Sequence, residues 1–171
     1  MEDRLPSFVL AELFGNSLVN ISKEAKQELT KTEKQPSQKI YLGNYEKKII
    51  VLVNDAANMY LSDNSLQFLT EILNACKLNF AHIALINFNK HAVNFLQLKK
   101  EMQPAYILGF GVSALQIDLP FDMPHYQVQQ YSNCTITTAP SLDVINQSTQ
   151  QAKAEKKKLW SSLQKMFDLE K

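Results

Sequence analysis

The chain has 171 residues, of which 45% are hydrophobic and 20% are charged, with a formal net charge of +1. This composition is typical of a globular protein, and the length suits one domain of about 120 to 150 residues with a tail. The near-neutral charge lacks the basic surplus that dominates phosphate recognition, so we expect no direct contact with DNA.

Several features of the sequence bear on location. No apolar stretch approaches the roughly 20 residues needed to cross a bilayer. The acidic start lacks the basic and apolar regions of a secretory signal. Cys76 and Cys134 are isolated, with no CxxC spacing and no histidine nearby. We therefore expect reduced core thiols, a cytoplasmic protein and no membrane partner.

The first part of the chain divides into two segments. Residues 1–21 contain an amphipathic pattern that ends at Gly15-Asn16, a natural helix stop. Residues 22–38 are rich in Lys, Glu, Gln, Thr and Ser, the composition of a mobile linker. A short helix on such a linker is not stable alone, so it must dock on its own domain or on a partner. We expect 1–21 to be a docking tail whose contact residues are Phe8, Leu10, Leu13 and Phe14.

Residues 39–171 carry the alternating strand and helix pattern of an α/β domain. Ile49–Val53 is a continuous β-branched run, typical of a strand that is covered on both faces. Further strands are expected at His82–Phe88, Ala105–Gly109, Gln127–Gln130 and Cys134–Thr138. Together they predict a three-layer α/β/α domain with a mainly parallel central sheet of about four to five strands.

The helices are predicted from caps and from apolar spacing. One follows the capping residues at 62–65 and runs to Cys76; a second is marked by Ala92, Phe95, Leu96 and Met102. Pro140-Ser141 begins a short helix through Ile145. The last helix, from about Thr149 to Asp168, is expected to bury the apolar residues Leu159, Trp160, Leu163, Met166 and Phe167.

Two places in the domain could hold chemistry. Asn54-Asp55 follows the first strand, where α/β folds place catalytic and binding groups, and a carboxylate there could activate a water as a general base. The alternative, which we favour, is that both side chains bond the local backbone of the turn that leaves the strand. Gly109-Phe110-Gly111 also follows a strand, but it lacks the third glycine of a dinucleotide fingerprint and is explained by a tight turn.

The remaining residue types predict no metal or cofactor. The three histidines, His82, His91 and His125, are scattered and share no ligand spacing. His82 opens a strand and His91 a helix, where surface or capping roles suffice. Trp160 could anchor a partner, but its helical spacing favours packing onto the sheet, which leaves Phe8 and Phe14 as the better interface anchors.

Taken together, these motifs resemble the psi subunit of the bacterial DNA polymerase III clamp-loader complex. The resemblance extends from Ile49 to Phe167 and rests on three features in order. They are the strand end Val53-Asn54-Asp55, the turn Pro140-Ser141-Leu142, and the closing helix with Leu159-Trp160. The tail segment 10–15 resembles the tail of that family, which docks on the clamp loader.

The resemblance implies the fold of uracil-DNA glycosylases without their activity. In those enzymes the first strand ends in a Gly-rich, Asp-Pro-type motif that activates water, and a His-Pro-Ser-Pro-Leu loop enters the minor groove. Here Asn54-Asp55 lacks the Gly and the Pro, and Ala139 stands in place of the His. Because base flipping needs an electrophilic donor in the pocket, the resemblance implies a member with no catalytic residues.

The function expected from this resemblance is that of a protein–protein adaptor in DNA replication. Its partners would be the clamp-loader ATPase subunits, reached through the tail, and a chi-like subunit. Two alternatives remain open: a divergent uracil-DNA glycosylase that positions water with Asp55, and an α/β binding module whose ligand lies above Asn54 and Gly109.

Overall fold

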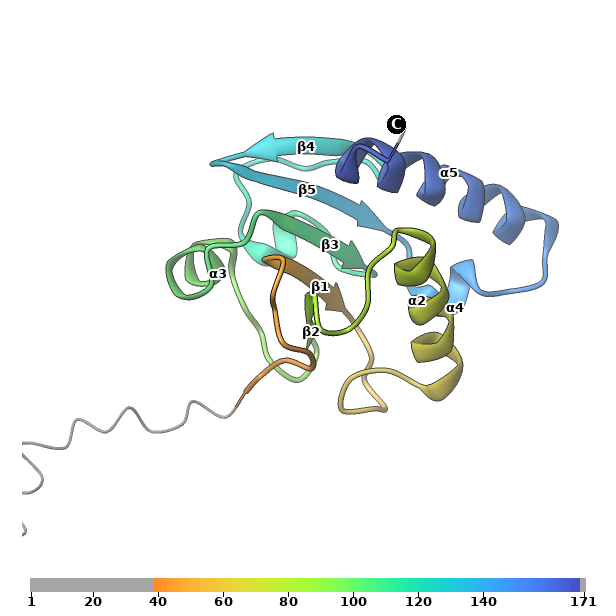
Figure 1. Ribbon diagram of the computed structural model, residues 1–171, viewed down its shortest axis with the longest axis horizontal. Helices are drawn as coiled ribbons and strands as arrows, with labels where there is room; N and C mark the ends of the chain where they lie inside the picture. Colours follow the sequence, from red (N-terminus) through yellow and green to blue (C-terminus); the bar gives the residue numbers. More distant parts are fainter. Residues whose placement is uncertain (1–38, 170–171) are drawn as a thin grey trace, which may run out of the picture. The chain divides into compact units, whose positions relative to one another are not determined.

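The computed structural model of the protein describes residues 39–169, so the predicted tail and linker lie outside the described part. The domain is built on a mixed, mostly parallel sheet of five strands in the order β2-β1-β3-β5-β4 (Figure 1). The strands are β1 (Ile49–Val53), β2 (Ile83–Asn87), β3 (Tyr106–Phe110), β4 (Val128–Tyr131) and β5 (Cys134–Ala139). Only β4 runs antiparallel to its neighbour.

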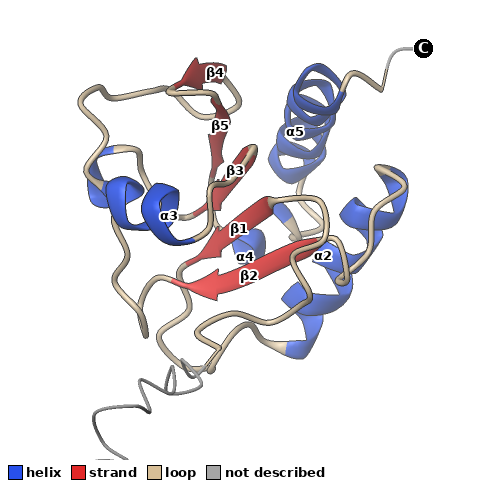
Figure 2. Cartoon of the chain, turned by 60° about the vertical axis from the view of Figure 1, so that its left-hand side comes forward, coloured by secondary structure: helices blue, strands red, loops and turns tan. Residues whose placement is uncertain are grey.

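Both faces of the sheet are covered, as the sequence predicts. Alternate residues of β1 point to opposite faces: Val51 packs in one apolar cluster and Ile50 in the other. The first cluster includes residues of three helices, α2 (Asp63–Ala75), α4 (Leu142–Ile145) and α5 (Gln150–Phe167). The second includes residues of α3 (Phe95–Glu101) and of the 3-10 helix η1 (Leu115–Ile117). Figure 2 shows α3 on one side of the sheet and α2, α4 and α5 on the other.

Helix starts follow the polar residues that precede them. The Ser62 hydroxyl accepts the backbone N–H of Ser65, the Asn94 side chain accepts that of Gln97, and Thr149 accepts that of Ala152. Each contact satisfies a backbone donor that the first turn of a helix leaves free. These caps set the starts of α2, α3 and α5.

Several predicted boundaries are wrong by a few residues. The second helix begins at Phe95 rather than near Ala92, because Asn94 caps it, and His91 therefore does not open it. Leu96, one of the apolar residues that mark this helix, is 72% exposed. The strand expected at 105–109 is β3, shifted by one residue, so Gly109 lies inside the strand and only Gly111 belongs to the turn.

The outer edge of β2 is covered by the chain that enters the domain. Leu42 forms an antiparallel bridge with Leu85, with N–H to carbonyl distances of 2.9 and 2.8 Å. The Tyr45 N–H donates to the carbonyl of Ile83 at 3.1 Å. A strand edge with its backbone groups unpaired invites pairing with other chains, so this segment protects the sheet.

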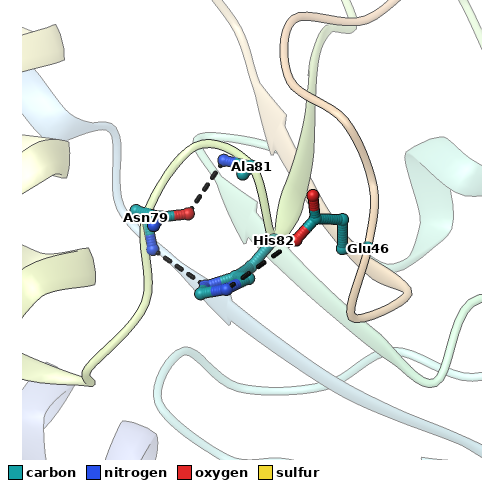
Figure 3. Close-up of polar contacts among 4 residues, drawn as sticks. All are labelled: Glu46, Asn79, Ala81 and His82. Atoms are coloured by element: carbon teal, nitrogen blue, oxygen red, sulfur yellow. Dashed lines mark hydrogen bonds and ion pairs between the residues drawn. The ribbon is translucent and has the colours of Figure 1, made fainter.

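His82 lies at the start of β2 and holds the turn before it (Figure 3). Its Nδ1 accepts the N–H of Asn79 at 3.2 Å, while its Nε2 lies 4.0 Å from the Glu46 carboxylate. The Asn79 side chain accepts the N–H of Ala81 at 3.0 Å. This histidine therefore has a local role at the amino end of β2, the opposite end of the strand from Asn87.

The two cysteines are free thiols in the core, as predicted. Burial raises the pKa of Cys76 to about 11, and burial likewise raises that of Cys134 to about 11. Both thiols therefore stay protonated near neutral pH. Within residues 39–169, no helix combines the length and apolarity required to cross a membrane.

Candidate functional site

The carboxyl ends of the parallel strands meet at one edge of the sheet, where two of the segments that carry the resemblance lie. Asn54 follows β1, Gly111 follows β3 and Pro140 follows β5. The strand order reverses between β1 and β3, and open α/β sheets bind ligands at such a switch point. Parallel pairing therefore brings together motif residues that are far apart in the sequence.

Asn54 links the ends of three strands. Its side-chain Nδ2 donates to the carbonyl of Gly111 at 3.3 Å, and its Oδ1 accepts from the Asn89 side chain at 3.3 Å. The Asn54 side chain is exposed, so it remains accessible from solvent at the switch point. Beside it, the Lys90 ammonium donates to the carbonyl of Ala56 at 2.7 Å.

Asp55 is turned into its own loop. One carboxylate oxygen accepts the backbone N–H groups of Ala57 at 2.9 Å and Asn58 at 3.0 Å. The other accepts the Asn58 side chain at 3.0 Å and the backbone N–H of Ser62 at 3.2 Å. Both oxygens are thus engaged within residues 55–62, as in the turn role that the sequence favours.

The ionisation of Asp55 reflects these hydrogen bonds. Burial raises the pKa of the Asp55 carboxyl, but the hydrogen bonds from Asn58, Ala57 and Ser62 outweigh burial and lower it below its ordinary value. Hydrogen bonds to the charged form favour that form. The carboxylate is therefore ionised at neutral pH and occupied by the loop that it organises.

Asn87 is a residue of this edge that the sequence does not single out. Its side chain, fully buried at the end of β2, donates to the carbonyls of Asp55 at 2.7 Å, Asn58 at 3.0 Å and Met59 at 3.2 Å. Its Oδ1 accepts the N–H groups of Asp55 and Asn89, each at 3.1 Å. The one signal in the sequence that could have pointed to Asn87 is its amide side chain at the end of an otherwise apolar buried strand.

The turn at Gly111 brings β3 against the Pro140-Ser141 segment. Gly111 has a φ of +68°, and a Cβ added there would lie 3.2 Å from the Cβ of Ser141. Its N–H donates to the carbonyl of Ala139 at 2.9 Å. Glycine satisfies both the positive φ and the close approach. Asn54 and Ser141 therefore flank the same glycine, although Ser141 forms no side-chain cap on α4.

The closing-helix motif lies away from this edge. Leu142 and Leu159 share the apolar cluster beneath α4 and α5. Trp160 does not pack onto the sheet, which corrects the prediction: its side chain is 37% exposed. The buried stripe of α5 is centred on Leu159 and Met166, with Ser162 on one side and Leu163 on the other, so Trp160 falls at its margin.

Ser162 belongs to the buried face of α5 although its side chain is polar. Its hydroxyl lies within hydrogen-bond reach of the Tyr126 carbonyl and, at 3.1 Å, of the Lys158 carbonyl. The hydroxyl is therefore satisfied inside the protein, so the buried face accommodates a small polar residue. Phe167, also predicted to be buried, is half-buried and packs on Tyr106 with ring centroids 5.1 Å apart.

The exposed tryptophan lines a groove between α2 and α5, which we call the α2–α5 groove. Its volume is about 200 Å³. Its apolar walls are formed by Phe68, Ile72 and Ala75 of α2 and by Leu159, Trp160 and Leu163 of α5. The Lys156 ammonium lies 4.9 Å from the centre of the Phe68 ring.

Replacement of Asn87 tests the network at the strand edge. We expect Asn87→Ala to lower the free energy of unfolding by about 2–3 kcal/mol, because it leaves buried backbone groups without partners. The matched change Asn89→Ala, at an exposed position, should stay within about 0.5 kcal/mol of the parent protein. Urea denaturation of both variants makes the measurement. Equal losses for the two variants would contradict the role assigned to Asn87.

The depressed pKa of Asp55 gives a pH test. The ordinary value is 3.8 and the folded value is lower, so the stabilisation is complete above pH 3.8 and is lost as pH falls through the folded pKa. We expect Asp55→Asn to have a lower urea midpoint than the parent at neutral pH. The difference should shrink below pH 3.8. A difference that is independent of pH would show that the carboxylate charge is not involved.

The sequence matches no protein-family model and is similar to no curated protein. The geometry nevertheless groups the motif residues into two places: the strand edge with Asn54, Asp55, Pro140 and Ser141, and the α2–α5 groove with Leu159 and Trp160. Phe8, Leu10, Leu13 and Phe14 lie outside the described residues.

Proposed function

We propose that this protein is a non-catalytic adaptor of the replication machinery. In this proposal it is a psi-like subunit with a uracil-DNA glycosylase-like fold. The mostly parallel sheet supports the fold assignment, because it puts the strand end at Asn54 and the Pro140-Ser141 turn on either side of Gly111. Those are the two segments whose equivalents form one site in the enzymes. A clamp-loader subunit works in the cytoplasm, which is the location we propose.

The observation that carries the proposal is the state of Asp55. A glycosylase that used this carboxylate would need a free oxygen to position the attacking water. Both oxygens instead accept hydrogen bonds from residues 57–62 of the same loop. At the other half of the edge, Ala139 is buried and offers its backbone carbonyl to Gly111. The geometry thus favours a structural strand end.

The adaptor would work through two separate surfaces. The tail supplies an amphipathic segment, with Phe8, Leu10, Leu13 and Phe14 as its proposed contact residues, that folds onto a groove of the clamp-loader ATPase subunits. Residues 22–38 act as a tether, which raises the effective concentration of the domain near the clamp loader. The α/β domain then holds a second partner, such as a chi-like subunit.

Pull-down of clamp-loader ATPase subunits tests the tail. We expect the full chain carrying Leu10→Asp and Leu13→Asp to lose this capture, because charges on the apolar face prevent burial in the groove. Deletion of residues 1–21 should have the same effect. The matched change Glu12→Gln, on the polar side of the same segment, should leave capture intact. Unchanged capture by the double variant or the deletion would refute the adaptor proposal.

An excision assay tests the enzymatic alternative. We expect no release of uracil when the protein is incubated with uracil-containing single-stranded DNA, because no oxygen of Asp55 is free to hold the water. The matched control is Asp55→Ala. If the parent protein excises uracil and this variant does not, the protein is a glycosylase that uses Asp55.

A further inference from the structure

We infer that the α2–α5 groove binds an amphipathic helix of a partner protein whose apolar stripe is flanked by acidic residues. The inference rests on the proposed adaptor function in one respect: an adaptor needs a second binding surface. The tail variants and the groove experiments below are independent, so either proposal can fail alone.

The first argument is the apolar surface that the groove leaves open. Trp160 is 37% exposed, and Ile72 on the opposite wall is half-buried. A tryptophan that is partly exposed beside an apolar cavity is the kind of side chain that contributes most when a partner covers it. Leu159 and Leu163 are buried beneath it and form a firm floor. The groove is therefore already shaped in the free domain.

The second argument is shape. The polar residues Asn64 and Gln67 of α2 and Asn146 after α4 line a continuation of the groove that shares Phe68 and Glu71 with its apolar part. Together the two parts follow α2 from Asn64 to Ala75, which is about 16 Å of helix. That length accommodates about three turns of a bound helix, and a groove between two helices is a common site for an amphipathic one.

The third argument is charge. Lys153 and Lys157 of α5 are exposed, two turns and one turn before Trp160, and neither forms an ion pair with any residue that the structure describes. Lys156 adds a third positive charge at the wall. By contrast, Lys158 pairs with Glu155 at 3.0 Å.

The opposing charge on the α2 wall is smaller. Among the residues that line the groove and its continuation, Glu71 is the acidic one. The α5 rim is thus positive, and it complements a ligand whose apolar stripe is bordered by carboxylates. A basic amphipathic helix would meet like charges on this rim, so the partner chemistry is acidic.

Trp160 is the only tryptophan in the chain, so its fluorescence reports directly on the groove. The probe is a synthetic helical peptide of about 15 residues, with leucine at every third or fourth position and glutamate beside that stripe. A second peptide has lysine in place of each glutamate. Titration into the full-length protein should give a saturable blue shift of Trp160 emission and less quenching by acrylamide with the acidic peptide.

The comparison between peptides decides the charge argument. We expect the lysine peptide to bind at least about tenfold more weakly than the acidic peptide. Added salt should weaken the binding of the acidic peptide. No shift with the acidic peptide, or equal binding of both peptides, overturns the proposal. A shift that depends on protein concentration without peptide would mean that a second copy of the chain fills the groove, which also overturns it.

Variants locate the binding surface independently of the tryptophan signal. With a labelled acidic peptide and anisotropy as the readout, Trp160→Ala should weaken binding about tenfold or more, while Leu96→Ala, a more exposed apolar residue on α3, should not. The exposed pair Lys153→Glu and Lys157→Glu should also weaken binding, whereas Lys100→Glu on α3 should not. Binding that is unchanged by the Lys153 and Lys157 pair overturns the proposal even if Trp160→Ala fails to fold.

Discussion

The buried amide of Asn87 is the interaction on which the arrangement of the β1–α2 loop depends. A fully buried polar side chain must find partners inside the protein, and Asn87 finds them in the loop that follows β1. That loop is closed by Asp55, which accepts the N–H of Ser62, and Ser62 in turn caps α2. The position of α2, one wall of the α2–α5 groove, is thus connected to one amide at the end of β2.

The main strands could be predicted because they are apolar on both faces and short. Ile49–Val53 alternates between two cores, so only a covered strand accommodates its unbroken apolar run. The network of Asn87 could not be predicted, because its partners in the loop lie about 30 residues earlier in the chain and only the pairing of β1 with β2 brings them together. The role of the Asp55 carboxylate needed only local information, since all the groups that donate to it lie in the same loop, from Ala57 to Ser62.

Trp160 shows a different limit of sequence reading. Helical periodicity predicts which residues share a face, but the centre of the buried face depends on what the neighbouring element offers. Here the buried face includes Ser162, whose hydroxyl is satisfied by the carbonyl of Tyr126, and Trp160 lies at the rim of that face. The residue that a simple pattern assigns to the core is instead the one that another molecule can reach.

The bridge between Leu42 and Leu85 has a mechanical consequence for the proposed adaptor. Any tension carried by the chain that precedes Lys39 reaches the sheet through this bridge and through the contact of Tyr45 with Ile83. These bonds attach the entering chain to the edge of β2, and β2 also carries the Asn87 amide at its far end. If residues 22–38 act as the proposed tether, a pull on them would therefore load the same strand that holds the β1–α2 loop in place.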